Sequence, residues 1–197
     1  MDWHTAHHTA IDYNAEMADL TALPNKLDVK KCTCRAIIET PKNRRNKFDY
    51  EQESNLFCLG GLLPEGMAFP FDFGFVPSTL GEDGDPLDVM VLMDEPAHVG
   101  CLLDVRIVGV IEADQSEDGK TETNDRLLAV AVHSYTHEHI TSIDNVSDVL
   151  LDQVEAFFVS YNKQRGKKFK VKKRGGPKRA LAIIQAGVAA FKKKHRK

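Results

Sequence analysis

Residues 83–92 read DGDPLDVMVL, the most informative stretch of the sequence for both structure and chemistry. Asp83, Asp85 and Asp88 place three carboxylates within six residues, where they repel one another unless a positive charge compensates them. The glycine and the proline between them predict a tight turn, and the apolar run that follows predicts a buried strand. Carboxylates held at a strand end suit a hard cation such as Mg²⁺. A solvated acidic hairpin is the competing interpretation, because Asp-Gly is also a common turn pair.

The rest of the chain has the pattern of a small, turn-rich β structure followed by two helices. Residues 32–38 alternate in hydrophobicity with a period of two, which predicts a strand. Further strands are predicted at residues 55–59, 89–93, 102–111 and 127–133. Apolar residues at three- and four-residue spacing predict helices over 148–163 and from Pro177 onward. The fold class expected from this pattern is mainly β with flanking helices, an α+β arrangement.

The length and composition predict a single globular domain. The chain has 197 residues, of which 42% are hydrophobic, and this is enough apolar mass for a real core. Pro24-Asn25 separates an N-terminal extension, residues 1–25, from a main domain, residues 26–197. The sequence has no apolar run near the roughly 20 residues of a membrane span and no secretory pattern at its start. A cytoplasmic location is therefore expected.

Charge is separated along the chain. Residues 81–125 contain 13 Asp and Glu against two basic residues, and residues 163–197 contain 15 Lys and Arg with no acid. Both regions could be solvated surfaces, which is the usual meaning of a charge run. A basic surface that binds a polyanion is the functional alternative.

The acidic segment is one of several motifs in a fixed order. Residues 83–89 match Asp-x-Asp-Pro-hydrophobic-Asp-hydrophobic, and upstream of them stand IIETP at 37–41, KFD at 47–49 and MAFPFDFGFVP at 67–77. Downstream stand Asp125 before the strand, and the pair FF followed by Tyr161. In type and order these motifs resemble the soluble family I inorganic pyrophosphatases.

The resemblance implies a fold and a reaction. The fold is a five-stranded, OB-like closed β-barrel with two C-terminal helices. The reaction is the hydrolysis of inorganic pyrophosphate to two phosphates, with several Mg²⁺ ions as cofactor. Partners on this interpretation are the pyrophosphate substrate and further copies of the chain in a homo-oligomer, with no membrane and no nucleic acid.

The resemblance also implies roles for individual residues. Asp85 matches the acid that accepts the proton of the attacking water. The expected metal ligands are Asp83, Asp88 and Asp125, with Glu39 and Asp49 as second-rank ligands and Asp114 or, in the longer loop of this chain, Asp118 as a further one. The expected substrate-binding residues are Lys47, Tyr161, Lys163 and Arg126.

The chain departs from the family pattern where the pattern holds phosphate. An Arg expected within residues 58–62 is missing, and Phe73 stands in place of a Tyr. A Lys expected at 127 is Leu127, with Arg126 one position earlier, and a Lys expected at 162 is Asn162, with Lys163 one position later. A shift of one residue on a strand turns a side chain to the opposite face, so Arg126 does not automatically replace the Lys. Other basic residues of the C-terminal block, Lys167, Lys168 and Arg174, are alternative replacements.

Three functions remain open from the residues. The first is a Mg²⁺-dependent pyrophosphatase with rearranged phosphate contacts. The second keeps the metal centre but acts on another P–O–P compound, such as a nucleotide or polyphosphate, and is suggested by the open, glycine-bearing stretch at 60–61. The third is a catalytically silent protein that binds a polyanion through its basic C-terminal region.

Overall fold

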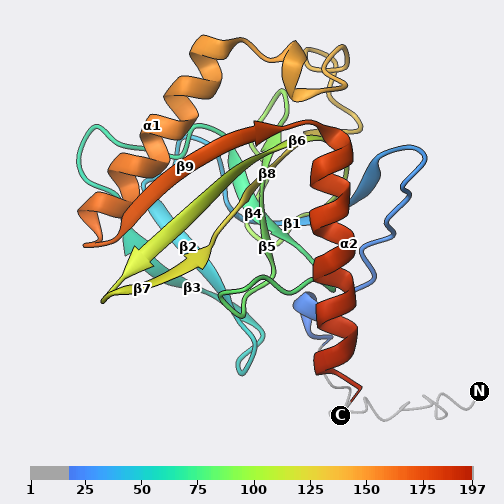
Figure 1. Cartoon of the computed structure of the whole chain (residues 1–197), viewed down its shortest axis with the longest axis horizontal. Coiled ribbons are helices and arrows are strands. Elements are labelled where there is room, and N and C mark those ends of the chain that lie inside the picture. Colours follow the sequence, from blue (N-terminus) through green and yellow to red (C-terminus); the bar gives the residue numbers. More distant parts are fainter. Residues whose placement is uncertain (1–17, 197) are drawn as a thin grey trace, which may run out of the picture.

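The computed structural model describes residues 18–196 and has a ring of β-strands with two long helices (Figure 1). Strand β1 pairs with β4, β4 with β5, β5 with β8, β8 with β6, and β6 returns to β1. These pairings close a ring of five strands, which are β1 Thr33–Thr40, β4 Asp72–Val76, β5 Leu87–Leu92, β6 Leu102–Glu117 and β8 Arg126–Ala131. The predicted five-stranded, mainly β fold is confirmed.

Four more strands lie outside this ring, and two of them extend its sheet. The long strand β6 continues beyond the ring and pairs there with two further strands, β7 Lys120–Thr123 and β9 Lys168–Gly175. A separate hairpin is formed by β2 Asn46–Glu51 and β3 Leu56–Leu62. Short 3₁₀ helices occur at η1 Leu20–Ala22 and η2 Ile143–Asn145.

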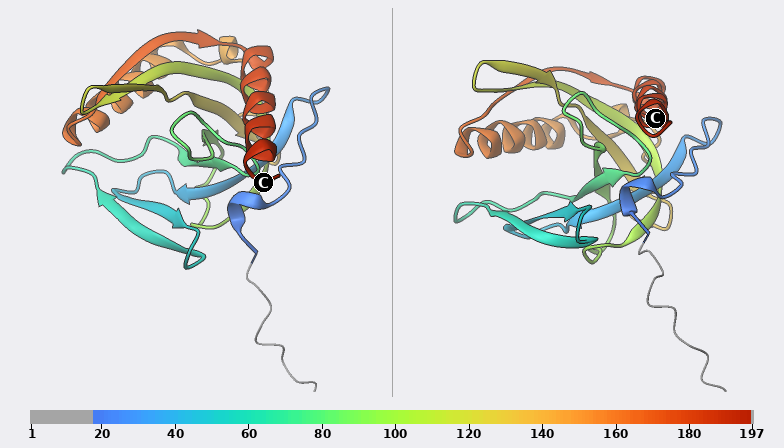
Figure 2. Two further views of the ribbon diagram at one scale, coloured as in Figure 1. Left: turned by 60° about the horizontal axis from the view of Figure 1, so that its bottom comes forward. Right: turned by 90° about the horizontal axis from the view of Figure 1, so that it is seen from below.

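The two helices begin and end where their sequences predict. Helix α1, Asp148–Gln164, buries Leu151, Val154 and Phe158, and Gly166 just beyond it has the positive φ of 75° that favours glycine. Helix α2, Pro177–Lys194, has proline in its first turn and three lysines in its last, in agreement with the helix dipole. Figures 1 and 2 show α1 and the β2–β3 hairpin on one side of the ring and α2 on the opposite side. No helix among the described residues is long and apolar enough to cross a membrane.

Alternate residues of the ring strands fill two hydrophobic clusters. On β5, Met90 and Leu92 belong to the cluster that contains Phe158 of α1. Val89 and Val91 belong to the cluster that contains Ile184 of α2. Because successive side chains of a strand point to opposite faces, a fully apolar strand can serve both clusters at once. The carboxylates that precede Val89 are thus held at the end of a strand that is buried on both faces.

The separated charges of the sequence meet in space. Strand β9 carries much of the basic block and pairs with the acidic strand β6. Lys172 Nζ lies 2.7 Å from Asp114 Oδ1, and Arg179 Nη2 lies 2.7 Å from Glu112 Oε2. Arg174 donates to three acids of α1, which are Asp148, Asp152 and Glu155. Much of the basic block is therefore neutralised within the fold.

Some of the expected organisation is changed by the structure or lies outside it. The sequence pattern does not predict β9, which lies within the basic residues 163–197. Most of the expected N-terminal extension, residues 1–25, lies outside the described residues, and the boundary at residue 25 stays a prediction. Its described end contacts the domain, since Tyr50 Oη accepts a hydrogen bond of 3.0 Å from Leu20 N.

Candidate active site

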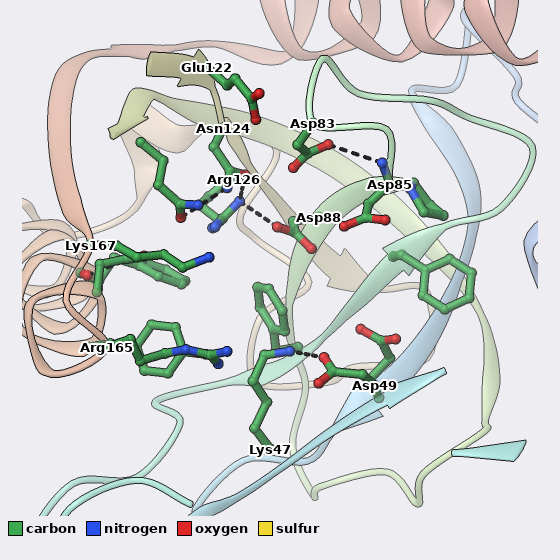
Figure 3. Close-up of a pocket in the computed structure, with 18 of the residues that line it drawn as sticks. Lys47, Asp49, Asp83, Asp85, Asp88, Glu122, Asn124, Arg126, Arg165 and Lys167 are labelled. Carbon is green, nitrogen blue, oxygen red and sulfur yellow. Dashed lines mark hydrogen bonds and ion pairs between the residues drawn. The ribbon is translucent and has the colours of Figure 1, made fainter. Parts of the chain in front are cut away.

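One cavity of about 520 Å³ collects most of the polar residues singled out from the sequence. It opens between the β2–β3 hairpin, the β4–β5 loop and the end of α1 (Figure 3). Seven carboxylates line it against four basic side chains. The carboxylates are Glu39, Asp49, Asp83, Asp85, Asp88, Glu117 and Glu122, and the basic residues are Lys47, Arg126, Arg165 and Lys167. This excess of negative charge would repel an anionic substrate unless cations entered with it.

The acidic loop presents Asp83, Asp85 and Asp88 to the cavity (Figure 3). The loop is closed by its own backbone, since Gly81 N donates to Asp85 O at 2.7 Å and Asp85 N donates to Asp83 Oδ1 at 3.2 Å. Desolvation raises the pKa of Asp83 to about 6, and burial also raises the pKa of Asp88. Both shifts reflect the cost of burying a charged carboxylate, which a positive charge beside it offsets.

Two more carboxylates reach the cavity from β1 and β2. Glu39 accepts a hydrogen bond of 2.9 Å from Tyr50 N, and burial raises the pKa of this carboxyl to about 7. Asp49 forms an ion pair with Lys47. A Cβ on Gly60 of β3 would overlap the Asp49 carboxylate, so this glycine is needed for the close approach of the acid. The Asp49 carboxylate thus occupies the Cβ side of Gly60, while a second, smaller cavity of about 260 Å³ is lined by Gly60 and Gly61.

Arg126 is a buried cation in the wall of the cavity. The residue is only 4% exposed, and its Nη1 donates to Asp88 Oδ2 and Asn124 Oδ1. Its guanidinium carbon lies 5.9 Å from the ring centre of Phe73, 5.2 Å from that of Phe158 and 5.5 Å from that of Phe169. Such contacts with aromatic faces favour a positive charge. Phe73, which lacks the expected tyrosine hydroxyl, instead offers its ring to Arg126.

The end of α1 and the turn after it supply a second group of cations. Arg165 donates to Tyr161 Oη, and its guanidinium carbon lies 5.5 Å from the centre of that ring. Lys167 Nζ lies 2.8 Å from Glu117 Oε2. Figure 3 shows Arg126, Arg165 and Lys167 on one side of the cavity and Asp83, Asp85 and Asp49 on the other. An elongated anion can therefore contact cations at one end and carboxylate-bound metal at the other.

Three of the expected site residues, Asp125, Asp114 and Lys163, do not line this cavity. Asp125 accepts a hydrogen bond of 3.0 Å from Ala113 N. Asp114 is paired with Lys172. Asp114 on β6 points away from the cavity because side chains of a strand alternate with a period of two, and Asp125, just before β8, also lies outside the cavity. Lys163 is exposed on α1, and the alternative replacements Lys168 and Arg174, like the alternative ligand Asp118, also lie outside the cavity.

Gln115 and Asn124 line the cavity where Asp114 and Asp125 are expected. The sequence pattern does not indicate either amide. They lie one residue from Asp114 and Asp125, and Asn124 Nδ2 donates to Gln115 Oε1 at 3.2 Å. Period-two alternation places Asp125 with Leu127 on one face and Asn124 with Arg126 on the other. Leu127 and Leu128 are both buried in the core, so the sequence pattern alone does not indicate which of the two faces meets the cavity.

Comparison with known proteins identifies the family of this chain. The family model described as inorganic pyrophosphatase matches residues 36–192. The chain belongs to the inorganic pyrophosphatase family. The inorganic pyrophosphatase of Thermus thermophilus is 32% identical over 179 residues, which are 89% of this chain and 99% of that protein. That of Nostoc is 30% identical over 174 residues, covering 88% and 99%.

Solved pyrophosphatases have the same fold. The crystal structure of the Thermus thermophilus inorganic pyrophosphatase matches with a TM-score of 0.81 at 31% identity and covers 89% of this chain and 99% of that one. The inorganic pyrophosphatase from Neisseria gonorrhoeae matches with a TM-score of 0.80 at 26% identity, covering 88% and 99%. The OB-like architecture expected of a pyrophosphatase is thus shown for this chain.

The residues of the cavity fit the metal dependence of inorganic pyrophosphatases. All the donors offered by the acidic wall are oxygens, which suit Mg²⁺ better than softer metals. Within residues 18–196, no three His, Cys, Asp or Glu side chains are gathered tightly enough to hold a metal ion by themselves. Mg²⁺ in proteins is usually held by one or two carboxylates together with several waters and substrate phosphates.

Proposed function

We propose that this chain hydrolyses inorganic pyrophosphate to two phosphates with Mg²⁺ as cofactor. The observation that carries the proposal is the cavity itself, in which a wall of carboxylates faces a wall of cations. Pyrophosphate has a charged phosphate group at each end and needs positive charge at both. Arg165, Lys167 and Arg126 supply it at one end. The acidic loop supplies it at the other through bound Mg²⁺.

We assign the Mg²⁺ ligands to the carboxylates that face the cavity. Asp83 and Asp88 are the main ligands, and Glu39 and Asp49 lie beside them on β1 and β2. When bound, Mg²⁺ lowers the pKa of a coordinated water and neutralises charge on the phosphate oxygens. Asp114 and Asp125 are not part of this proposal, because their side chains are engaged elsewhere.

Substrate contacts come from residues that differ in part from those expected. Lys47 and Tyr161 line the cavity as expected, and so does Arg126. Arg165 and Lys167 take the place of Lys163 and of the Arg that is missing from β3. A guanidinium can hold two oxygens of one phosphate at once. Four cations around one cavity are enough to bind an anion of the size of pyrophosphate.

Asp85 is the proton acceptor in this proposal. It lines the cavity, and its backbone is held by the loop hydrogen bonds to Gly81 and Asp83. The attacking water gives one proton to Asp85 while its oxygen bonds to one phosphorus. The bond between that phosphorus and the bridging oxygen breaks, and the bridging oxygen leaves with the second phosphate. Arg165 and Lys167 stabilise the charge that develops on the phosphate oxygens.

Phosphate release distinguishes this function from its alternatives. Purified protein is assayed with pyrophosphate, tripolyphosphate and ATP, each with Mg²⁺ and with a chelator. We expect turnover of pyrophosphate with Mg²⁺ alone, and we expect Asp85→Asn to reduce it by at least about 100-fold. Asp118→Asn, in the exposed β6–β7 turn, is the matched control and keeps full activity. Faster release from tripolyphosphate or ATP would select a different substrate, and silence toward all three with salt-sensitive nucleic-acid binding would select a polyanion-binding role.

Two further features are part of the proposal. We expect a homo-oligomer, which light scattering on the purified chain measures directly. We also expect the protein in the cytoplasm, which fractionation of cells that express it would test.

A further inference from the structure

Arg126 is the most constrained charged group in the cavity. It has one hydrogen-bonding face toward Asp88 and Asn124 and one stacking face toward the rings of Phe73, Phe158 and Phe169. Its Nη1 also donates to Asp125 O at 3.2 Å. Its Nε is buried among the aromatic rings without a hydrogen-bond partner. A side chain held in this way cannot swing out of the wall without breaking all of these contacts.

The position of Arg126 matters because of what lies on either side of it. Asp88 and Asn124 would otherwise present two oxygens to the same point of the cavity, and Nη1 of Arg126 occupies that point. Asn124 and its neighbour Gln115 are neutral amides, so this part of the wall offers a divalent ion less charge than carboxylates would. The acidic loop on the other side of Asp88 keeps its full set of carboxylates.

We propose that Arg126 is a resident cation that takes the place of a divalent ion between Asp88 and Asn124. The cavity consequently binds one divalent ion fewer than the same wall would bind with a carboxylate at 124 and no arginine. The remaining ions bind on the side of Asp83, Asp85 and Glu39. This inference rests on the proposed metal-dependent function and adds that part of the positive charge around the substrate is built into the chain.

Arg126 supplies a positive charge that does not depend on the metal concentration. A guanidinium fixed on three aromatic faces keeps its charge and its geometry at every metal concentration. Asp88 Oδ2 is engaged by Arg126, while no donor among residues 18–196 is hydrogen-bonded to Oδ1, which faces the side of the acidic loop where an ion would bind. Asp88 thus lies between the built-in cation and the metal.

Counting bound ions tests the inference without any substrate. Mn²⁺ is titrated into the protein, and free Mn²⁺ is measured by electron paramagnetic resonance to give the number bound at saturation. We expect the double variant Arg126→Met/Asn124→Asp to bind one ion more per chain than the wild type. Asn124→Asp alone, with Arg126 still in place, is the matched control and is expected to bind the wild-type number. Equal, non-zero numbers for wild type and a folded double variant would overturn the inference and leave the proposed function standing.

A measurement on the wild-type chain covers the case in which the double variant does not fold. The side-chain ¹⁵N signals of Arg126, assigned by their absence in Arg126→Lys, report how tightly the guanidinium is held. With saturating Mg²⁺ we expect these signals to stay in slow rotation at unchanged positions. Sharpening to the signals of a free guanidinium would show that the ion displaces Arg126, and this would overturn the inference. If the wild type binds no ion at all, the inference and the metal dependence of the proposed function both fail.

Discussion

The guanidinium of Arg165 lies over Gly61, with Nη1 4.0 Å from the point that a Cβ on Gly61 would occupy. Gly61 belongs to the stretch of β3 from which an expected arginine is missing. The positive charge therefore reaches this part of the cavity from the turn after α1 and not from β3. Stacking on Tyr161 holds Arg165 in this position.

Arg165→Ala should weaken the use of pyrophosphate without affecting the fold. The loss of charge-assisted hydrogen bonds costs about 1.5–3 kcal/mol, which is about 10- to 150-fold in kcat/KM. Steady-state phosphate release measures the effect. Lys163→Ala, two residues earlier on α1 but outside the cavity, should leave kcat/KM unchanged. Equal values for the two variants would show that Arg165 does not contact the substrate.

A pair of matched substitutions distinguishes the acidic β4–β5 loop, which lines the cavity, from Asp125 before β8, which does not. Asp83→Asn removes a carboxylate from the cavity and should weaken Mg²⁺ binding at least tenfold, or about 1.4 kcal/mol. Asp125→Asn keeps an oxygen that can accept the hydrogen bond from Ala113 N, and Mg²⁺ affinity should not change. Isothermal titration calorimetry measures both. If Asp125→Asn weakened binding as much as Asp83→Asn, Asp125 would have to reorient and serve as a ligand.

Glu39 should make the metal-free protein less stable as the pH rises. Burial raises the pKa of its carboxyl from 4.5 to about 7, so the folded chain holds this proton more tightly than the unfolded chain. The stabilisation is fully present below about pH 4.5 and is lost as the pH rises through about 7. Urea unfolding in a chelator should show a fall in unfolding free energy between these limits.

Glu39→Gln should flatten this pH dependence. We expect the variant to be more stable than the wild type at about pH 8, by about 1–3 kcal/mol. Glu138→Gln, in an exposed loop outside the cavity, is the control and should follow the wild-type curve. A wild-type curve that does not fall relative to Glu39→Gln would contradict the assigned environment of Glu39.

Gly74 tests the closure of the ring. A Cβ at this position of β4 would overlap the carbonyl oxygen of Ile37 on β1, and neither backbone has room to move because both strands are buried. Gly74→Ala should cost at least about 3 kcal/mol of unfolding free energy in chemical denaturation. Gly61→Ala, where the added Cβ makes only an ordinary contact, should cost less than about 1 kcal/mol. A near-neutral Gly74→Ala would show that β1 and β4 do not pair this closely.

The acidic loop could be predicted from the sequence because its chemistry is local. Asp83, Asp85 and Asp88 are joined by a tight turn and anchored on an apolar strand, so their proximity does not depend on distant residues. The two helices were predictable for the same reason, since periodicity and end signals lie within each segment. The motif order from Glu39 to Tyr161 was sufficient to indicate the family.

Only the tertiary structure decided which residues of β6 and β8 face the cavity. Each of these strands has two faces one residue apart, and a bulge exchanges them; the β6–β8 pair has one between Ile107 and Gly109. The resemblance to the family therefore implies Asp114 and Asp125, while Gln115 and Asn124 line the cavity. That Gln115, Asn124 and the buried Arg126 line the cavity, while Asp114 and Asp125 do not, became visible only when strands distant in sequence were paired.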